Sequence, residues 1–241
     1  MKENIKVEFD KLGKEATLIL REGKAAEIVV PAKLAYAGRL DTPQKFLQGK
    51  ISEYEKLACT LVVDTDNGTL QFIGSEKNRE SVDTISGALV TSEILKEFCI
   101  NETRRFTVKE LIELFKRNRA YFATKDQQAA LLANLRNWNV GVTKLYEEIR
   151  NDATGDAKKG IETKVEGINL PPFILNLPLF KGYSPESVEI EFGVDASGAG
   201  VTLFLDSPDL LERMLVRKKE LIDEQTAWFS AEFGCSIIYK S

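Results

Sequence analysis

The 241-residue sequence contains no histidine at all. Histidine is the usual proton acceptor of serine and cysteine hydrolases and the commonest protein ligand of zinc. Its absence therefore excludes Ser-His-Asp and Cys-His catalysis, H-E-x-x-H proteases and nearly every zinc enzyme. Catalysis would have to rest on carboxylates, lysines, tyrosines or a metal held by oxygen atoms. Because no pattern in the chain clearly supplies such a site, we assign no catalytic residue, no cofactor and no resident metal, and we favour a protein that is not an enzyme.

Cysteines and long apolar runs are also scarce. The three cysteines, Cys59, Cys99 and Cys235, are widely spaced and form no C-x-x-C pair. This favours buried free thiols in a reducing compartment over disulfides or a zinc site. No apolar stretch has the length that a bilayer span needs, and the first residues, MKENIKVEF, lack the apolar run of a signal peptide. The sequence predicts a cytoplasmic protein with no membrane partner.

The clearest secondary-structure pattern lies near the C-terminal end. Apolar residues alternate with polar ones in three segments, which predicts three strands with the last two joined as a hairpin: 173–179, 188–192 and 201–205. A helix should follow, with Ser207 as N-cap and Pro208 at its first position. Its apolar stripe consists of Leu211, Met214, Leu215, Leu221, Ile222 and Trp228. We expect Gly234 to end this helix before a final strand over 235–239.

Local signals place the remaining elements. Asn67-Gly68 predicts a hairpin turn, because this pair accepts positive φ at little cost. Thr107 and Glu110 have the spacing of a capping box at the start of a helix. The other expected elements are short strands within 4–30, a short helix from Thr42, a short helix over 92–98 and a long helix over about 125–150.

These patterns predict an α+β fold, with a mainly antiparallel sheet covered by the long C-terminal helix and with a helical insertion in the middle. We expect one compact domain made of three parts. Residues 1–105 form a β-rich part, 106–160 the helical insertion, and 161–241 a β-β-β-α-β unit. The sheet edges, especially near Pro178, should be either blunted or used for self-association, which would make the protein a homo-oligomer.

Residues 101–150 are locally basic. They contain ten Lys and Arg against six Asp and Glu, a net charge of +4, so the remainder of a chain of net charge −4 carries −8. Cations neutralise phosphates and aromatic rings stack on unpaired bases, so the segment is a candidate groove for single-stranded DNA. The candidate contact residues are Arg104, Arg105, Lys116, Arg117, Arg119 and Tyr121. The alternative is that the nearby Phe115 and Trp138 belong to the core and that the cations only keep helix faces soluble.

Two carboxylate patterns are candidates for catalysis. Residues 160–164, Gly-Ile-Glu-Thr-Lys, have the shape of the metal-binding strand of restriction-type nucleases. That chemistry also needs an upstream aspartate, which the sequence offers nearby only in the polar segment 151–160. Glu189 and Glu191 lie on one face of a predicted strand, where a solvated strand face explains both residues. Neither pattern makes an enzyme the leading interpretation.

The segment FILNLPLFKG (173–182), the two strands after it and the helix from Pro208 to Phe229 carry a resemblance to a known family. Weaker similarity lies over 60–72, in the helix that begins near Phe106, and around Trp138. On these residues the chain resembles the YfdQ-like family, a domain of unknown function encoded by phages and prophages. The resemblance implies a phage-encoded protein and an early-gene neighbourhood alongside DNA-processing genes. It supplies no catalytic residues.

Together, these observations favour a non-enzymatic phage accessory protein that binds nucleic acid in phage DNA metabolism, with single-stranded DNA as the expected partner. The main alternative is a protein-binding factor, such as an inhibitor of a host defence system or an assembly protein. A metal-dependent nuclease that uses oxygen ligands is a third interpretation, because carboxylates can hold magnesium without histidine.

Overall fold

The computed structural model describes residues 33–75, 77, 82–151, 170–195 and 201–240. The predicted strands within 4–30 and the 160–164 segment lie outside these residues. In chain order the main elements are β1 (Ala35–Arg39), α1 (Thr42–Gln48), β2 (Thr60–Asp64), β3 (Thr69–Gly74), β4 (Asp83–Ala88), α2 (Glu93–Phe98), α3 (Val108–Arg117), α4 (Lys125–Asn151), β5 (Phe173–Leu177), β6 (Glu186–Asp195), β7 (Thr202–Asp206), α6 (Leu210–Trp228) and β8 (Ser236–Lys240). Short helical turns lie at η1 (Ile51–Glu53), η2 (Lys56–Ala58), η3 (Arg119–Tyr121) and η4 (Phe229–Phe233).

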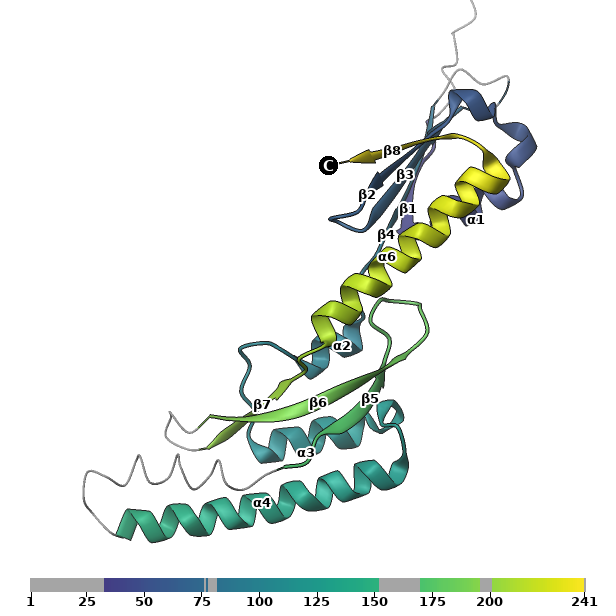
Figure 1. Cartoon of the computed structure of the whole chain (residues 1–241). Helices are drawn as coiled ribbons and strands as arrows, with labels where there is room; N and C mark the ends of the chain where they lie inside the picture. The colour runs from purple at the N-terminus through teal and green to yellow at the C-terminus, as the bar shows by residue number, and fades with distance from the viewer. Residues whose placement is uncertain (1–32, 76, 78–81, 152–169, 196–200, 241) are drawn as a thin grey trace, which may run out of the picture.

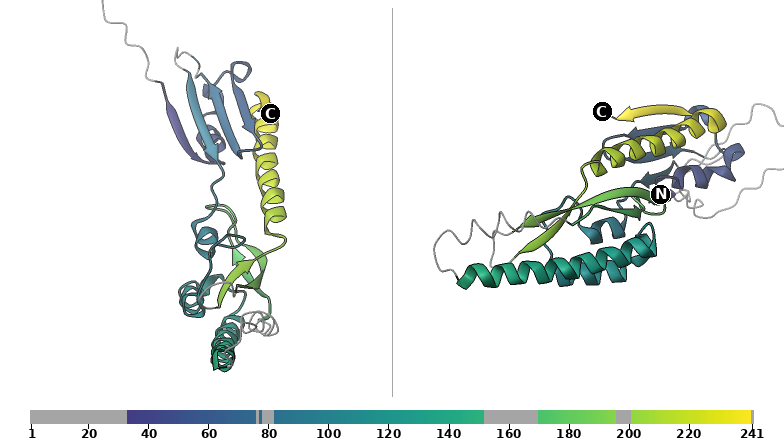
Figure 2. Two further views of the ribbon diagram at one scale, coloured as in Figure 1. Left: turned by 90° about the vertical axis from the view of Figure 1, so that its left-hand side faces the viewer. Right: turned by 60° about the horizontal axis from the view of Figure 1, so that its bottom comes forward.

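The described strands form two separate sheets at opposite ends of an elongated molecule (Figure 1). One sheet has five strands in the order β1-β4-β3-β2-β8, and the other has three in the order β5-β6-β7. The pairs β1–β4 and β2–β8 are parallel, and the other pairs are antiparallel. Helix α6 runs from one sheet to the other, and α4 lies along the three-stranded sheet (Figure 2). The predicted α+β class, with mostly antiparallel strands and a C-terminal helix, is confirmed.

The final strand β8 joins the five-stranded sheet, where it pairs with β2, and not the sheet formed by β5, β6 and β7. The unit expected over 161–241 therefore divides its strands between the two sheets. The physical reason is the length of α6. At about 1.5 Å per residue, its 19 residues carry the chain roughly 28 Å away from β7. How the chain divides into independently folding parts, including the helical insertion, stays a prediction.

The hairpin turn, the capping box and the end of the C-terminal helix formed where the local sequence predicts them. The β2–β3 hairpin turns at Asn67-Gly68 with Gly68 at φ +62°. The carboxylate of Asp64 accepts hydrogen bonds from the backbone and side-chain amides of Asn67, both at 2.9 Å, which lowers the pKa of Asp64 to about 2. Ser92 caps α2, and Thr107 and Glu110 form the complete capping box of α3. Gly234, at φ +74°, closes the turn after α6.

The start and the apolar stripe of α6 differ from the prediction. The N-cap is Asp209, because the hydroxyl of the fully buried Ser207 instead donates to the backbone oxygen of Glu189 at 2.7 Å. Leu221 and Ile222 are buried, but Leu211 and Leu215 keep 66% and 53% of their surface exposed. The N-terminal half of α6 spans the gap between the sheets, where it has less of the molecule to pack against (Figure 1).

Each sheet has its own aromatic cluster. Against the five-stranded sheet, Phe72 contacts Tyr54, Phe229 and Phe233 at ring-centroid distances of 5.5, 6.2 and 5.6 Å. Against the three-stranded sheet, Phe115 contacts Phe122 and Phe173, both at 5.4 Å. Because rings bury large apolar areas, each cluster anchors the helices that pack on its sheet.

Candidate functional site

The predicted nucleic-acid contact residues lie around α3. Arg104 and Arg105 precede it, Lys116 and Arg117 form its last turn, and Arg119 and Tyr121 follow in η3. The five cations are exposed, and Tyr121 is half-buried against the core. Cations in the last turn of a helix also interact favourably with the negative end of its dipole, so α3 gains from this placement without any ligand.

Most of these cations already have partners. Arg105 pairs with Asp195 at 2.9 Å, and its guanidinium lies 4.1 Å from the centre of the Phe204 ring. Lys116 pairs with Glu113 at 2.9 Å, and Arg117 lies 3.6 Å from Glu97.

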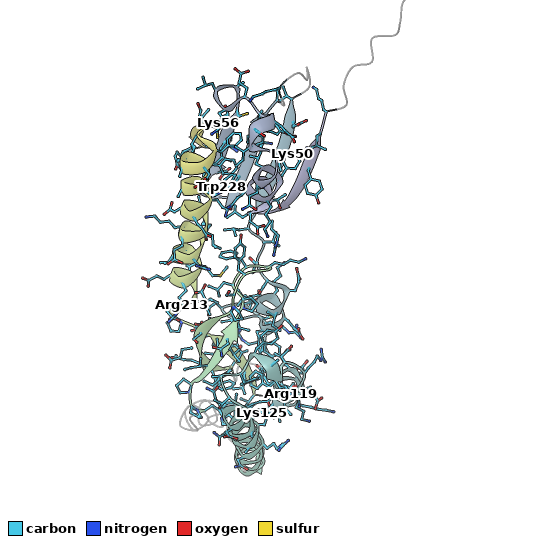
Figure 3. All side chains as sticks on the ribbon, turned by 90° about the vertical axis from the view of Figure 1, so that its right-hand side faces the viewer. Lys50, Lys56, Arg119, Lys125, Arg213 and Trp228 are labelled. Carbon is cyan, nitrogen blue, oxygen red and sulfur yellow. The ribbon has the colours of Figure 1, made fainter. Side chains whose placement is uncertain are left out.

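The two remaining arginines differ in what surrounds them. The guanidinium of Arg104 stacks 4.7 Å from the centre of the Phe106 ring. No carboxylate of a described residue pairs with Arg119, which lies with Lys125 at the end of the molecule opposite to Lys50 and Lys56 (Figure 3). The structure therefore leaves fewer cations around α3 available to a polyanion than the sequence indicates.

The aromatic residues of this segment are core residues. Phe115 is fully buried and Trp138 is 3% exposed, so neither ring can stack on a base. Phe122 is 6% exposed and packs edge-on against Phe115. The alternative weighed for Phe115 and Trp138, that they belong to the core, is the one the structure shows.

A hollow of about 480 Å³ lies beside α3, and its charges balance. It is lined by Glu97, Arg104, Phe106, Lys109, Glu110, Glu113, Leu114 and Arg117, with as many carboxylates as cations. Hydrogen bonds from Thr107 lower the pKa of Glu110, and a hydrogen bond from Lys116 lowers that of Glu113, so both stay ionised at neutral pH. A hollow with balanced charge gives a polyanion little net attraction.

The sequence interpretation missed the uncovered face of the five-stranded sheet. On one face, Leu61, Val63, Leu70, Phe72 and Ile85 are at most 1% exposed. Helices α1 and α6 lie on that side, and no described element covers the other (Figure 1). The strand register places one residue of each strand in a row across the open face: Ala37, Ser86, Gln71, Val62 and Ile238. The sequence signal that could have found it is in β3, where the apolar Leu70 and Phe72 alternate with the polar Thr69 and Gln71.

The outer strands of this sheet are β1 and β8, and β1 is the more exposed of the two. All five of its residues are exposed, and Tyr36 keeps 61% of its surface accessible. The N–H of Thr84 donates to the backbone oxygen of Leu34 at 2.8 Å, so alternate residues of β1 face β4. The backbone N–H and C=O groups of Ala35 and Ala37 therefore point away from β4. No described residue pairs with this edge.

By contrast, the chain's own segments bond to both outer strands of the three-stranded sheet. On β7, Phe106 and Leu203 exchange backbone hydrogen bonds of 2.7 and 2.8 Å. On β5, Phe122 forms a bridge to Leu175. The side-chain amide of Gln127, oriented so that both its groups are satisfied, accepts from the Ile174 N–H at 2.8 Å and donates to its carbonyl oxygen at 3.2 Å. The edge that ends at Pro178 is thus covered.

The described residues add little support for catalysis or membrane insertion. They contain no group of three or more side chains placed to hold a metal ion. Glu189 and Glu191 are exposed on one face of β6, as a solvated strand face requires. None of the helices in the described ranges is both long and apolar enough to cross a bilayer.

Comparisons with family models, with curated protein sequences and with solved structures find no match to this chain.

Proposed function

We propose that this protein is a non-enzymatic binding protein that captures an extended strand of a protein partner on the free edge of β1. One observation carries the proposal. The backbone groups of Ala35 and Ala37 have no partner among the described residues, whereas both edges of the three-stranded sheet are bonded by the chain itself. An unpaired strand edge is a template for a further strand.

The side chains of β1 suit this role. Ala35, Ala37 and Gly38 are small, so a partner backbone can approach the edge closely. Tyr36, beside the buried Ile85 in the sheet register, offers an exposed ring on the covered side. We therefore expect a partner strand with an apolar side chain next to Tyr36 and small side chains on the open face. The other outer strand, β8, is less suitable because it ends in the charged Lys240, which pairs with Asp64 at 3.3 Å.

The test uses the full chain with a photo-crosslinking residue at position 36 and an extract of host cells. Ala37→Pro removes only the outward N–H, so it blocks strand addition but leaves the β1–β4 hydrogen bonds intact. We expect Ala37→Pro to reduce the crosslinked partner about tenfold, with the crosslinked peptide mapping to one segment of that partner. Arg117→Glu with Arg119→Glu is the matched control and should leave the crosslink unchanged.

Three results would contradict the proposal: a crosslink insensitive to Ala37→Pro, a crosslink to residues 1–32 of the same chain, or a crosslink to a second copy. The last two would mean that the edge is closed by the protein itself. The resemblance to the YfdQ-like family leads us to propose further that the protein is a phage-encoded accessory factor. A host-defence or assembly protein is then the expected class of partner.

Nucleic-acid binding is the second candidate. It is favoured by the net charge of +4 on residues 101–150 and by Arg119, whose charge no described carboxylate neutralises. If single-stranded DNA binds there, log affinity should fall with log salt by about 0.7 per phosphate contact. Titrating labelled single-stranded and duplex DNA at two salt concentrations measures this slope. Arg117→Glu with Arg119→Glu should abolish binding, and Ala37→Pro should not change it.

A further inference from the structure

Two cysteines that are far apart in the sequence begin two neighbouring strands. Strands β2 and β8 are parallel, with Thr60 opposite Ser236 and Leu61 opposite Ile237. Cys59 and Cys235 directly precede these strands, each one residue before the first paired position. Neighbouring strands lie about 4.8 Å apart. The Cα atoms of disulfide-bonded cysteines are usually about 4.4–6.8 Å apart, so the backbone spacing suits a bond between them.

The two thiols also lie on the same side of the sheet. Cys59 has an extended backbone and lies two residues before the buried Leu61, which places its side chain on the covered face. Cys235 lies two residues before Ile237, is half-buried and packs against the same core. After burial, the nearby Cys59 thiol is the next cause that raises the pKa of Cys235, as expected for neighbouring sulfurs.

We propose that Cys59 and Cys235 form a reversible disulfide that ties β8 to β2. The oxidant is a small disulfide such as oxidised glutathione. The thiolate of the more exposed Cys235 attacks one sulfur of that molecule, forms a mixed disulfide and releases one small thiol. The thiolate of Cys59 then attacks the Cys235 sulfur and releases the second small thiol. The protein loses two protons and two electrons, and the small disulfide takes up both.

The packing of the two cysteines predicts that thiol–disulfide exchange at this pair is slow. Burial is the main cause that raises the pKa of Cys59 and brings that of Cys235 to about 11, so little thiolate exists at neutral pH. Because β8 is an outer strand with exposed residues, its transient opening would release Cys235 first. Once formed, the bond would hold β8, and through η4 the end of α6, on the five-stranded sheet. This inference is independent of the proposed binding at β1.

The experiment incubates the full chain in glutathione buffers of increasing oxidised fraction, alkylates the remaining thiols and maps the bonds by mass spectrometry. We expect one intramolecular Cys59–Cys235 bond, with Cys99 alkylated. Cys235→Ser should abolish the bond, and the matched control Cys99→Ser should retain it. The same oxidation in denaturant should lose this selectivity, because the unfolded chain no longer holds the two strands in register.

A second measurement keeps the test decisive if a serine variant folds poorly. Oxidation should raise the thermal midpoint of Cys99→Ser by several degrees and leave that of Cys235→Ala unchanged, because only the former can close the bond. The proposal is overturned if all three thiols stay alkylatable in the most oxidising buffer. It is equally overturned if the native bond involves Cys99 or joins two chains.

Discussion

The two sheets of this protein differ in whether other segments of the described chain form hydrogen bonds to their outer strands. In the three-stranded sheet, the connection between α2 and α3 bonds to β7, and the segment from η3 into α4 bonds to β5. In the five-stranded sheet, β1 presents its outer backbone groups with no described partner, and no element of the described ranges covers one of the faces. Natural proteins usually protect such edges, and this difference between the described parts of the two sheets is the basis of the proposed binding at β1.

The largest effect on stability should come from removing a ring of the aromatic cluster that packs against the three-stranded sheet. Phe115 is fully buried and contacts four other rings within 6.3 Å, those of Phe98, Phe122, Phe173 and Phe192. Phe115→Ala should lower the free energy of unfolding by about 3–5 kcal/mol. Chemical denaturation measures this loss. A loss below about 1 kcal/mol would show that α3 is not anchored by this cluster.

A smaller loss should follow from removing the side-chain bonds that Asn101 makes to Ser207, directly after β7. The side chain of Asn101 donates to the carbonyl oxygen of Ser207 at 2.9 Å and accepts from its N–H at 2.7 Å, and Asn101 has φ +60°. Asn101→Ala should cost about 1–3 kcal/mol for the partners it leaves unpaired, plus about 1 kcal/mol of backbone strain. Asn101→Gly removes the same bonds without the strain. Equal unfolding free energies for Asn101→Ala and Asn101→Gly would contradict the assignment of backbone strain at this position.

The β2–β3 hairpin should make the stability of the five-stranded sheet sensitive to acid. The folded-state pKa of Asp64 is lowered to about 2, first by its hydrogen bonds with Asn67. A depressed pKa stabilises the fold above the unfolded value of about 3.9, and this contribution is lost as the pH falls towards 2. The stability difference between the wild type and Asp64→Asn should therefore shrink between about pH 4 and pH 2. A difference that stays constant over that range would exclude this linkage.

The smallest effect is expected at the open edge itself. Ala37→Pro should change the free energy of unfolding by no more than about 0.5 kcal/mol, because the lost N–H has no partner among the described residues and the backbone is already extended. Leu203→Pro is the contrasting variant. The N–H of Leu203 donates to Phe106 on the covered edge, so this variant should unfold far more readily. Similar losses of unfolding free energy for the two variants would mean that the N–H of Ala37 is also hydrogen-bonded in the folded protein.

The sequence predicted those features that depend on neighbouring residues. The turn at Asn67-Gly68, the short helix over 92–98 and the capping box at Thr107 each need only a few adjacent positions. The partner of β8 could not be predicted, because Thr60 and Ser236 are 176 positions apart (236 minus 60). For the same reason, the sequence showed the charge of Arg105 but not Asp195, which lies beside it only in the folded chain.

The long separation between β2 and β8 has a consequence for how the protein folds. Contacts between residues far apart in sequence form late, because the entropy of closing a long loop must be lost before any contact is gained. The five-stranded sheet needs β8, whereas β5, β6 and β7 pair with near neighbours in sequence. Pulsed hydrogen exchange during refolding should therefore protect the amides of β6 before those of β8. During synthesis, β2 would remain exposed on its β8 side until the ribosome had translated the rest of the described chain.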